Sequence, residues 1–285
     1  DHAYDKSRVR LLWHDLRAPL SEDLIASIGD IDYVANVASA SHVDRSISDP
    51  AVFFLNNASL IANMLEYARA TRPEKFLQVS TDEVFGPAYA GYCHKEWDPH
   101  VPSNPYSASK SAQEALCIAY WRTYGLPLII TNTMNNFGEG QHPEKFVPMI
   151  VRKLLADEEI AVHGKWVDEE FIPGSRYWLH ASSHADALIY LLSNMEPARY
   201  PDTDRPSRWN VVGDCEVDNL EMVGKIGAIL GKRPKVSRDD FHSSRPGHDL
   251  RYALDGEKLK AEGWSPRMDF EESLVQSVTT IASCV

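Results

Sequence analysis

Apolar and polar residues alternate with two different periods along the first half of the chain. Short apolar runs predict four strands, at 8–14, 32–38, 75–80 and 127–133. Longer segments with helical spacing predict three helices, at 20–28, 50–70 and 104–125. Gly125 stands where a glycine commonly ends a helix. Strands that alternate with helices are typical of βαβ units and predict a parallel sheet with helices on both faces.

This regularity weakens after about residue 135, where the loops lengthen and residues 164–178 show no clear period. The later elements expected are a strand at 209–213 and helices at 217–232 and near 270–282. We therefore expect an α/β protein with two parts. Residues 1–135 would form a Rossmann-type doubly wound parallel sheet, and residues 136–285 a smaller α/β substrate lobe interwoven with it. The ligand of such a fold lies beyond the carboxyl ends of the strands.

Composition narrows the classes of function. The 285 residues carry a formal net charge of −12, which argues against a general nucleic-acid or anionic-membrane binder. No apolar run approaches the length of a membrane span. The four cysteines have no metal-ligand spacing, so reduced thiols in a cytoplasmic protein and no metal site are expected; they are Cys93, Cys117, Cys215 and Cys284.

Two local patterns suggest chemistry. Tyr106 and Lys110 are four residues apart on a predicted helix and therefore share one face. A neighbouring ammonium favours the phenolate of a tyrosine, so this pair can remove a proton from a sugar hydroxyl while hydride leaves for a nicotinamide. A surface tyrosine and lysine would explain the spacing alone, but the pair follows a strand that ends in Ser80-Thr81-Asp82-Glu83. Two adjacent carboxylates at a strand end can serve as one acid and one base.

Five stretches, taken together, point to one family. They are SHVDRSI (41–47), STDEVFG (80–86), NPYSASK (104–110), NNFGEGQHPEKFVP (135–148) and RPGHDLRYALD (245–255). The chain resembles the extended short-chain dehydrogenase/reductases, and within them the nucleoside-diphosphate-hexose 4,6-dehydratases of the dTDP-glucose type.

The resemblance implies a division of roles. NAD would oxidise C4 of the hexose, with Tyr106 as the base and Thr81 bonded to the same oxygen. Glu83 would then remove the C5 proton and Asp82 would protonate the departing C6 hydroxyl, before hydride returns to C6. Lys110 would support Tyr106. One acid and one base are needed at once, and two carboxyls serve if their environments separate their pKa values.

Further positions follow from the same resemblance. Those expected to contact NAD, besides Tyr106 and Lys110, are Asp15, Leu16, Val37, Ala38, Ser39, Val79 and Ser80. Those expected to hold the nucleotide sugar are Ser41, His42, Asp44, Asn136, Lys145, Arg176, Asn210, Arg245 and His248. Arginine and lysine suit the oxygens of a diphosphate. Structural roles for Asn210 and His42 stay open. The family also implies a homodimer through the helices at 50–70 and 104–125. Apolar residues of these helices extend beyond one face, including Phe53, Phe54, Leu60, Leu116, Ile118 and Trp121.

The main departure is a missing motif, because no glycine-rich GxxGxxG turn precedes Asp15. A strand-helix-strand unit of about 40 residues is expected upstream in such a fold. His163 also stands where the family usually has an aromatic ring near the nucleobase of the substrate. Alternatives therefore stay open: a related 4-epimerase or UDP-glucuronate decarboxylase, which would not need Asp82, or a non-catalytic nucleotide-sugar-binding scaffold, which would not need the glycine turn.

Overall fold

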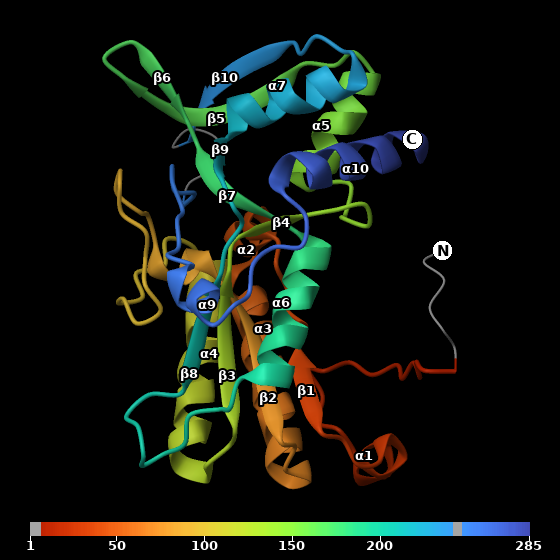
Figure 1. Cartoon of the computed structure of the whole chain (residues 1–285), viewed down its shortest axis with the longest axis vertical. Coiled ribbons are helices and arrows are strands. Elements are labelled where there is room, and N and C mark those ends of the chain that lie inside the picture. Colours follow the sequence, from red (N-terminus) through yellow and green to blue (C-terminus); the bar gives the residue numbers. More distant parts are fainter. Residues whose placement is uncertain (1–6, 242–246) are drawn as a thin grey trace.

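A four-stranded parallel sheet is the centre of the computed structural model, which describes residues 7–241 and 247–285 (Figure 1). In spatial order its strands are β1 (Tyr33–Asn36), β2 (Lys75–Thr81), β3 (Leu128–Thr133) and β8 (Ser207–Val211). All three pairings are parallel, with Phe76 of β2 opposite Leu128 of β3. The predicted α/β fold with a Rossmann-type parallel sheet is confirmed.

Helices cover both faces of this sheet. The long helices α3 (Pro50–Thr71) and α4 (Pro105–Tyr124) lie on one face, and α6 (Ala181–Asn194) and α9 (Glu257–Ala261) on the other (Figure 1). Neighbouring strand residues point to opposite faces, so Phe76 packs under α3 and α4 while Leu77 packs with α6. No helix within the described ranges is both long and apolar enough to cross a membrane.

The second lobe packs three helices against short strands. Its helices are α5 (Phe146–Leu155), α7 (Asn219–Leu230) and α10 (Phe270–Ser283). One sheet has the order β10 (Val236–Asp240), β5 (Ile160–Val167) and β6 (Glu170–Pro173), and the other β4 (Asn135–Phe137), β7 (Ser175–His180) and β9 (Glu216–Asp218). Buried Val151, Ile226 and Val278 join the helices in one core. Because β8 belongs to the central sheet, the chain of the second half returns to the first lobe.

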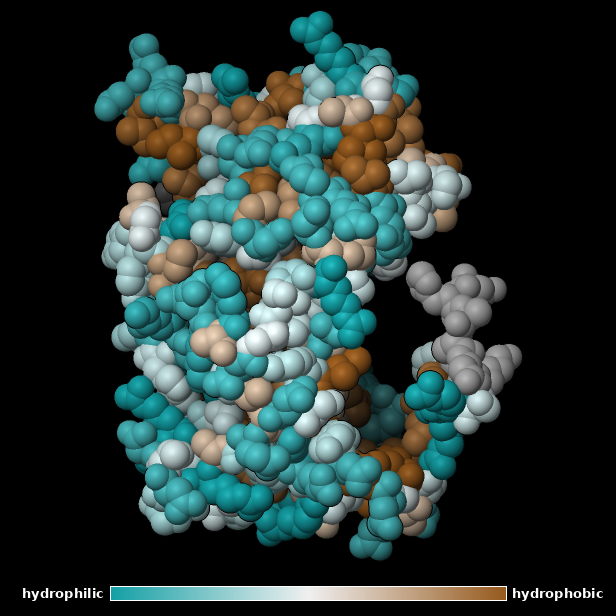
Figure 2. Space-filling view, viewed as in Figure 1, coloured by the Kyte–Doolittle hydropathy of each residue, from teal (hydrophilic) through white to brown (hydrophobic). Residues whose placement is uncertain are grey.

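The N-terminal segment differs from its prediction. Residues 8–14 were expected as a strand, and that prediction is wrong for this structure: the segment is exposed, with Trp13 93% accessible. A strand exists only by pairing with another, and β1 is the edge of the sheet. The segment stands apart from the body of the molecule (Figure 2). Next come α1 (Glu22–Ile28), where a helix was expected, and α2 (Val43–Ser48), which was not expected.

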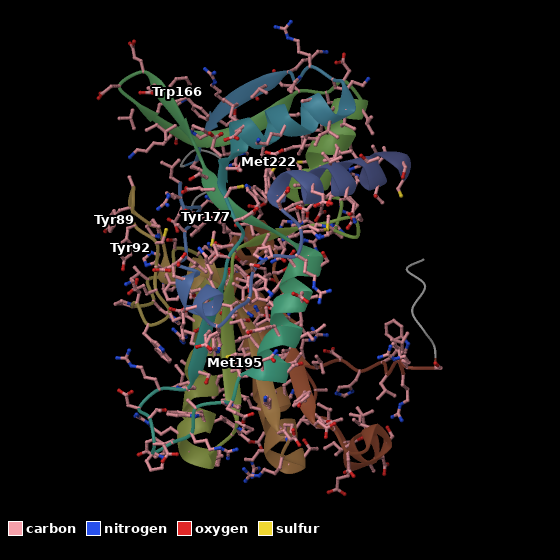
Figure 3. All side chains as sticks on the ribbon, in the orientation of Figure 1. Tyr89, Tyr92, Trp166, Tyr177, Met195 and Met222 are labelled. Carbon is pink, nitrogen blue, oxygen red and sulfur yellow. The ribbon has the colours of Figure 1, made fainter. Side chains whose placement is uncertain are left out.

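Residues 164–178 contain a β-hairpin that the sequence did not reveal. Strands β5 and β6 pair antiparallel around Asp168 and Glu169, which have positive φ values of 47° and 70°. Such turns usually carry asparagine or glycine, so Asp-Glu gives no recognisable hairpin signal. Trp166 lies on this projecting hairpin and is 45% exposed (Figure 3).

Candidate active site

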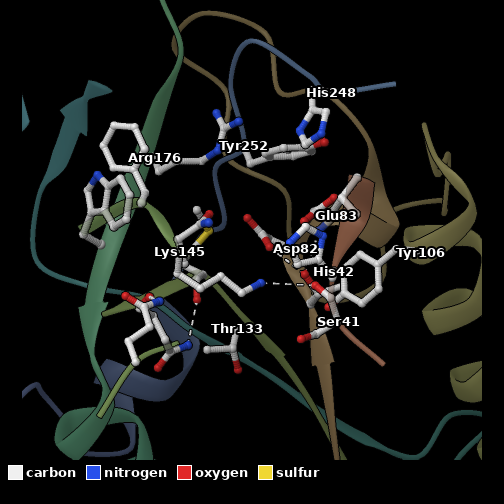
Figure 4. A pocket seen from close by; sticks show the side chains of 18 of the residues that line it. Ser41, His42, Asp82, Glu83, Tyr106, Thr133, Lys145, Arg176, His248 and Tyr252 are labelled. Carbon is white, nitrogen blue, oxygen red and sulfur yellow. Dashed lines mark hydrogen bonds between the residues drawn. The ribbon is translucent and has the colours of Figure 1, made fainter. Parts of the chain in front are cut away.

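A cavity of about 670 Å³ opens at the carboxyl ends of β2 and β3, where the second lobe faces the sheet. It brings together the side chains of Thr81, Asp82, Glu83, Tyr106 and Lys110. Figure 4 shows Asp82, Glu83 and Tyr106 on one side of it. They come from the end of β2 and the start of α4, which are distant in sequence. The cavity lies where a doubly wound sheet places its ligand.

The end of β2 explains how two adjacent carboxylates face one cavity. Residues of a regular strand point to alternate faces, but Thr81 ends the strand and Asp82–Phe85 forms one turn of 3-10 helix. The Thr81 hydroxyl accepts the amide of Glu83 at 3.3 Å and donates to Asp82 Oδ1 at 2.8 Å. Gly86 closes the turn at φ 77°, where a Cβ would lie 2.3 Å from the Val101 carbonyl oxygen. A larger residue there would push the turn away.

Both carboxyls have raised pKa values. Burial raises the pKa of Asp82 to about 6, and hydrogen bonding to Thr81 only partly opposes it. Burial and the charge of Asp82 raise the pKa of Glu83 to about 7, while Asn104 donates to Glu83 Oε2 at 3.1 Å and Arg176 favours the charged form. Two such carboxyls side by side share a proton near neutral pH, and the higher pKa of Glu83 places that proton mainly on Glu83 before substrate binds. One member of the pair can then donate while the other accepts.

Helix α4 delivers the tyrosine and the lysine. It begins with a capping box, in which the Asn104 side chain accepts from the Ser107 amide at 2.9 Å. Burial, followed by the charge of Glu83, raises the pKa of Tyr106 far above its usual range. Burial lowers the pKa of Lys110 to about 8. The Lys110 ammonium donates to the Val79 carbonyl at 2.8 Å and to Gln113 Oε1 at 2.7 Å.

The residues predicted to contact the cofactor divide into two groups. Four line the cavity beside Lys110, namely Val37, Ser39, Val79 and Ser80. The Ser80 hydroxyl is buried there without a hydrogen-bond partner in the part of the chain that the structure describes. Ala38 lies between Val37 and Ser39 but is not part of the lining.

Asp15 and Leu16 are not brought to this cavity. Asp15 is exposed and forms an ion pair with Arg17, and the Leu16 carbonyl accepts from Asn63 Nδ2 of α3 at 2.9 Å. Their predicted place beside an adenine stays a prediction, because the cavity described here does not extend to them.

Most residues predicted for the nucleotide sugar line the opposite wall. They are Ser41, His42, Asp44, Asn136, Lys145, Arg176 and His248. Lys145 reaches across to the Ser41 carbonyl at 3.3 Å (Figure 4). Asp44 Oδ1 lies 3.2 Å from His248 Nε2. The loop before α2 and the first turn of α2 are thus joined to the second lobe.

Two of the predicted substrate residues are not seen in this wall. Asn210 is not brought to the cavity: it is fully buried in β8 and donates to the carbonyls of His94 and Asp255, so its contact with the nucleotide sugar stays a prediction. An asparagine that satisfies two loop carbonyls has a structural role, as the open alternative allowed. Arg245 lies outside the described residues.

Arg176 is the buried cation of the cavity wall. Its guanidinium donates to the carbonyls of Leu250 at 3.0 Å and Asp249 at 2.9 Å, and it stacks over the Tyr252 ring at 4.5 Å. It also favours the charged forms of Asp82 and Glu83. The two carbonyls therefore hold the guanidinium in the wall of the second lobe that faces Asp82 and Glu83 (Figure 4).

Comparison with known families fits this arrangement of the site. The profile described as GDP-mannose 4,6 dehydratase matches residues 1–277. The chain is a member of the GDP-mannose 4,6 dehydratase family. This confirms the resemblance to nucleotide-sugar 4,6-dehydratases that the five motifs indicated.

Individual proteins of the family are similar over most of the chain. A dTDP-glucose 4,6-dehydratase of Xanthomonas campestris pv. campestris is 39% identical over 264 residues, covering 87% of this chain and 71% of that protein. DesIV, a dTDP-glucose 4,6-dehydratase of Streptomyces venezuelae whose crystal structure has NAD bound, has a TM-score of 0.82 and 31% identity over 95% of this chain and 78% of its own. The UDP-glucose 4-epimerase of Thermus thermophilus, in complex with NAD, has a TM-score of 0.82 at 24% identity, covering 95% of this chain and 84% of its own, which shows the fold alone.

In this dehydratase-family member, a stack of three rings lines the end of the cavity in the second lobe. His163 of β5 stacks on Phe241 with centroids 6.0 Å apart, and Phe241 stacks on His248 at 6.3 Å. The sequence singled out His163 and His248, but no motif marked Phe241. Long-range packing alone brings it between them.

His184 is a second residue that the family motifs did not mark. It lies on α6 and lines the cavity, with one ring nitrogen 3.1 Å from the Thr133 hydroxyl and the other 3.1 Å from Asn136 Oδ1. Burial lowers the pKa of His184 to about 4, so the ring is neutral and bridges β3 to β4. The segment that contains it, ASSHAD at 181–186, belongs to none of the five motif stretches.

Proposed function

We propose that the chain is an NAD-dependent nucleoside-diphosphate-hexose 4,6-dehydratase, a lyase that forms a 4-keto-6-deoxy sugar. The observation that carries this proposal is the pair of buried carboxyls, Asp82 and Glu83, whose raised pKa values bracket pH 6–7 beside Tyr106 in one cavity. Simple oxidation of an alcohol needs one base, whereas elimination of water needs an acid and a base together.

The residues of the cavity fit the nicotinamide end of NAD. Val37 presents an apolar side chain that is 59% exposed, and Ser80 presents a buried, unpartnered hydroxyl beside Lys110. An apolar surface next to a free hydroxyl suits a flat ring with a polar substituent. Val37, Ser39, Val79, Ser80 and Lys110 would hold this half of the cofactor. The sequence contains no glycine-rich turn for the pyrophosphate, so the assignment covers the nicotinamide end.

The residues of the site divide the proton transfers among them. NAD, when bound, supplies the oxidation of C4 and the later reduction of C6. Tyr106 Oη takes the proton of the C4 hydroxyl, and the ammonium of Lys110 favours the phenolate. The resulting ketone acidifies C5, whose proton passes to a carboxylate oxygen of Glu83. In the roles that the family implies, the proton shared by the pair lies on Asp82 during this step, and Asp82 gives it to the C6 oxygen, which leaves as water.

The cations on the facing wall support a diphosphate substrate. Lys145 and Arg176 line the cavity of a protein whose net charge of −12 would otherwise repel such a ligand. Arginine binds phosphate oxygens through two parallel hydrogen bonds. Relatives described as dTDP-glucose 4,6-dehydratases favour a dTDP- or UDP-hexose over GDP-mannose, whose name the family profile bears. The ring stack at His163 is the candidate neighbour of the nucleobase of the substrate.

A second assignment is a nucleotide-sugar binder without catalysis. Such a binder would use the same cavity and the same cations, and turnover distinguishes it from the enzyme. The related 4-epimerases and the UDP-glucuronate decarboxylases are less favoured, since their chemistry leaves the buried Asp82 without a task.

We also propose a cytoplasmic homodimer. Helix α3 exposes Val52, Phe54 and Leu55. Phe53 and Trp121, which were expected at the interface, are instead buried within the subunit at 8% and 1% exposure. The remaining apolar face of α3 and α4 is the surface offered to a second copy. Four free cysteines fit a reducing cytoplasm.

Incubation of the full chain with NAD and dTDP-glucose tests the proposed function. Mass spectrometry should find the nucleotide sugar converted to a species lighter by one water molecule. Parallel assays with UDP-glucose and GDP-mannose show which nucleobase the protein prefers in its substrate. Binding of these ligands without loss of water from any of them would contradict the dehydratase assignment and support the non-catalytic binder.

A further inference from the structure

Gln113 lies next to Lys110, about one helical turn further along α4. It follows Lys110 by three residues on α4 and is fully buried. Its Oε1 accepts a hydrogen bond from the Lys110 ammonium at 2.7 Å. The other acceptor bound to this ammonium is the Val79 carbonyl of β2, at 2.8 Å. One side-chain amide therefore supplies half of the protein contacts that the structure gives to Lys110 Nζ.

A relay of amides from three other elements fixes the orientation of Gln113. Its Nε2 donates to the Asn57 carbonyl of α3 at 3.0 Å. Gln78 of β2 donates from Nε2 to Gln113 Oε1 at 3.2 Å, and its own Oε1 accepts from Asn36 Nδ2 of β1 at 2.7 Å. The nitrogen of Gln113 is committed to a carbonyl, so its oxygen must face the ammonium. Strands β1 and β2 and helix α3 together aim this oxygen at Lys110.

The charge of Lys110 depends on such acceptors. An ammonium in a buried site loses its hydration, and burial already lowers the pKa of Lys110 to about 8. The titratable groups that bear on it are Glu114 and Cys117, both on α4. The contacts from β2 and α3 are the uncharged Val79 carbonyl and the Asn57–Gln113 link. Removing one of two hydrogen bonds to a buried ammonium disfavours its charged form.

We propose that Gln113 is a positioning residue of the active site, which holds the Lys110 ammonium charged and in place beside Val79 in the cavity wall. The family motifs mark Tyr106 and Lys110 but not Gln113. The consequence for catalysis rests on the proposed function, whereas the consequence for the ionisation of Lys110 does not.

Two substitutions at this position should move the ionisation of Lys110 in opposite directions. Gln113→Met keeps the length of the side chain but removes the acceptor, so the pKa of Lys110 should fall by about one unit. Gln113→Glu places a carboxylate against the ammonium, so the same pKa should rise by about one unit. A residue that only fills space would not shift the pKa in two directions.

The measurement is a pH titration of the lysine ¹³Cε signals of the full chain by NMR, with Lys110 assigned as the signal lost in Lys110→Arg. Ile61→Val is the matched control, because Ile61 is buried on α3 in the same core but makes no polar link to Lys110. It should leave the titration unchanged. Unshifted titration in both Gln113 variants, or shifts of the same sign, would overturn the proposal even if the chain were catalytically inactive.

In the active enzyme, the alkaline limb of the pH profile for kcat should follow the same shifts, with little change in KM. It should move to lower pH in Gln113→Met and to higher pH in Gln113→Glu. Shifted NMR titrations without turnover in any variant would leave Gln113 as the positioning residue and count against the dehydratase function. Turnover with an unmoved alkaline limb would overturn the role of Gln113 in catalysis.

Discussion

The Thr81 hydroxyl donates a hydrogen bond to the Asp82 carboxylate at 2.8 Å, so the residue that ends β2 also restrains the first carboxyl of the pair. The same oxygen accepts the amide of Glu83 and starts the 3-10 turn. One hydroxyl therefore has two effects. It caps the turn that presents both carboxyls, and it favours the ionised form of Asp82. Burial pushes the pKa of Asp82 up, and this bond limits the rise.

Removal of that hydroxyl should lower activity at neutral pH. Thr81→Val keeps the shape of the side chain but loses a bond to a charged group, which is worth about 1.5–3 kcal/mol. We expect kcat to fall by about 10- to 100-fold, because the 3-10 turn that presents both carboxyls loses its cap, while the pKa of Asp82 rises further. Thr81→Ser, which keeps the hydroxyl, is the control and should retain most of the rate. Steady-state kinetics of the two variants would reject the account if both lost activity equally.

The carboxyl pair should make stability depend on pH. The pKa of Glu83 is raised in the folded state, to about 7, so folding binds a proton that the unfolded chain releases above pH 4.5. Its stabilising effect is therefore complete below pH 4.5 and disappears as the pH rises through 7. Glu83→Gln should raise the free energy of unfolding at pH 8 relative to the native chain, by about 1–3 kcal/mol more than at pH 5.

Urea denaturation at the two pH values measures this difference. Glu74→Gln is the control, because Glu74 is an exposed carboxyl next to the start of the same strand and should show no such dependence. An equal effect of Glu83→Gln at pH 5 and pH 8 would show that Glu83 ionises as an ordinary surface carboxyl.

Arg176 should determine the affinity for diphosphate ligands. Arg176→Lys keeps the charge but loses paired hydrogen bonding, so the affinity for dTDP-glucose should fall by about 10-fold or more. Calorimetry with dTDP-glucose, UDP-glucose, GDP-mannose and free glucose should show no useful binding of the free sugar. Exposed Arg233→Lys is the control. Unchanged affinity in Arg176→Lys, or glucose binding as tight as that of the nucleotide sugars, would exclude a diphosphate contact.

The dimer can be tested on one exposed leucine. Leu55 of α3 is 61% exposed on the face proposed as the interface, so Leu55→Asp should convert a dimer to a monomer. Ile189 of α6 is 62% exposed on the other side of the sheet, and Ile189→Asp should leave the dimer intact. Sedimentation equilibrium at micromolar concentration decides, and a native chain that sediments as a monomer would remove the proposed interface.

The sequence predicted the parts of the fold that depend on local pattern. Tyr106 and Lys110 lie on one helix, and Thr81–Glu83 follows one strand, so spacing alone placed them together. The segment at 8–14 has the apolar pattern of a strand, but pairing is a long-range property and this segment has no such pairing in the described structure. The hairpin at Asp168–Glu169 lacked the usual turn residues.

The residues that support the site could not be predicted from the sequence, because their roles also depend on long-range contacts. Gln113, His184 and Phe241 act through partners that lie tens of residues away or on other elements. The bonds of Asn210 to two loop carbonyls could not be predicted either, because an asparagine at a strand end looks the same in sequence whether it serves a ligand or two carbonyls. Only the packed structure distinguishes those roles.

Single-turnover absorbance of NADH tests the central claim most directly. With NAD and dTDP-glucose supplied, Asp82→Asn should accumulate NADH, because oxidation proceeds while elimination slows by about 100-fold or more. Tyr106→Phe should form none, because the C4 hydroxyl keeps its proton. Exposed Asp204→Asn and Tyr89→Phe are the controls and should behave as the native chain. Full turnover in both site variants, or no NADH in any protein, would contradict the division of roles between Tyr106 and the carboxyl pair.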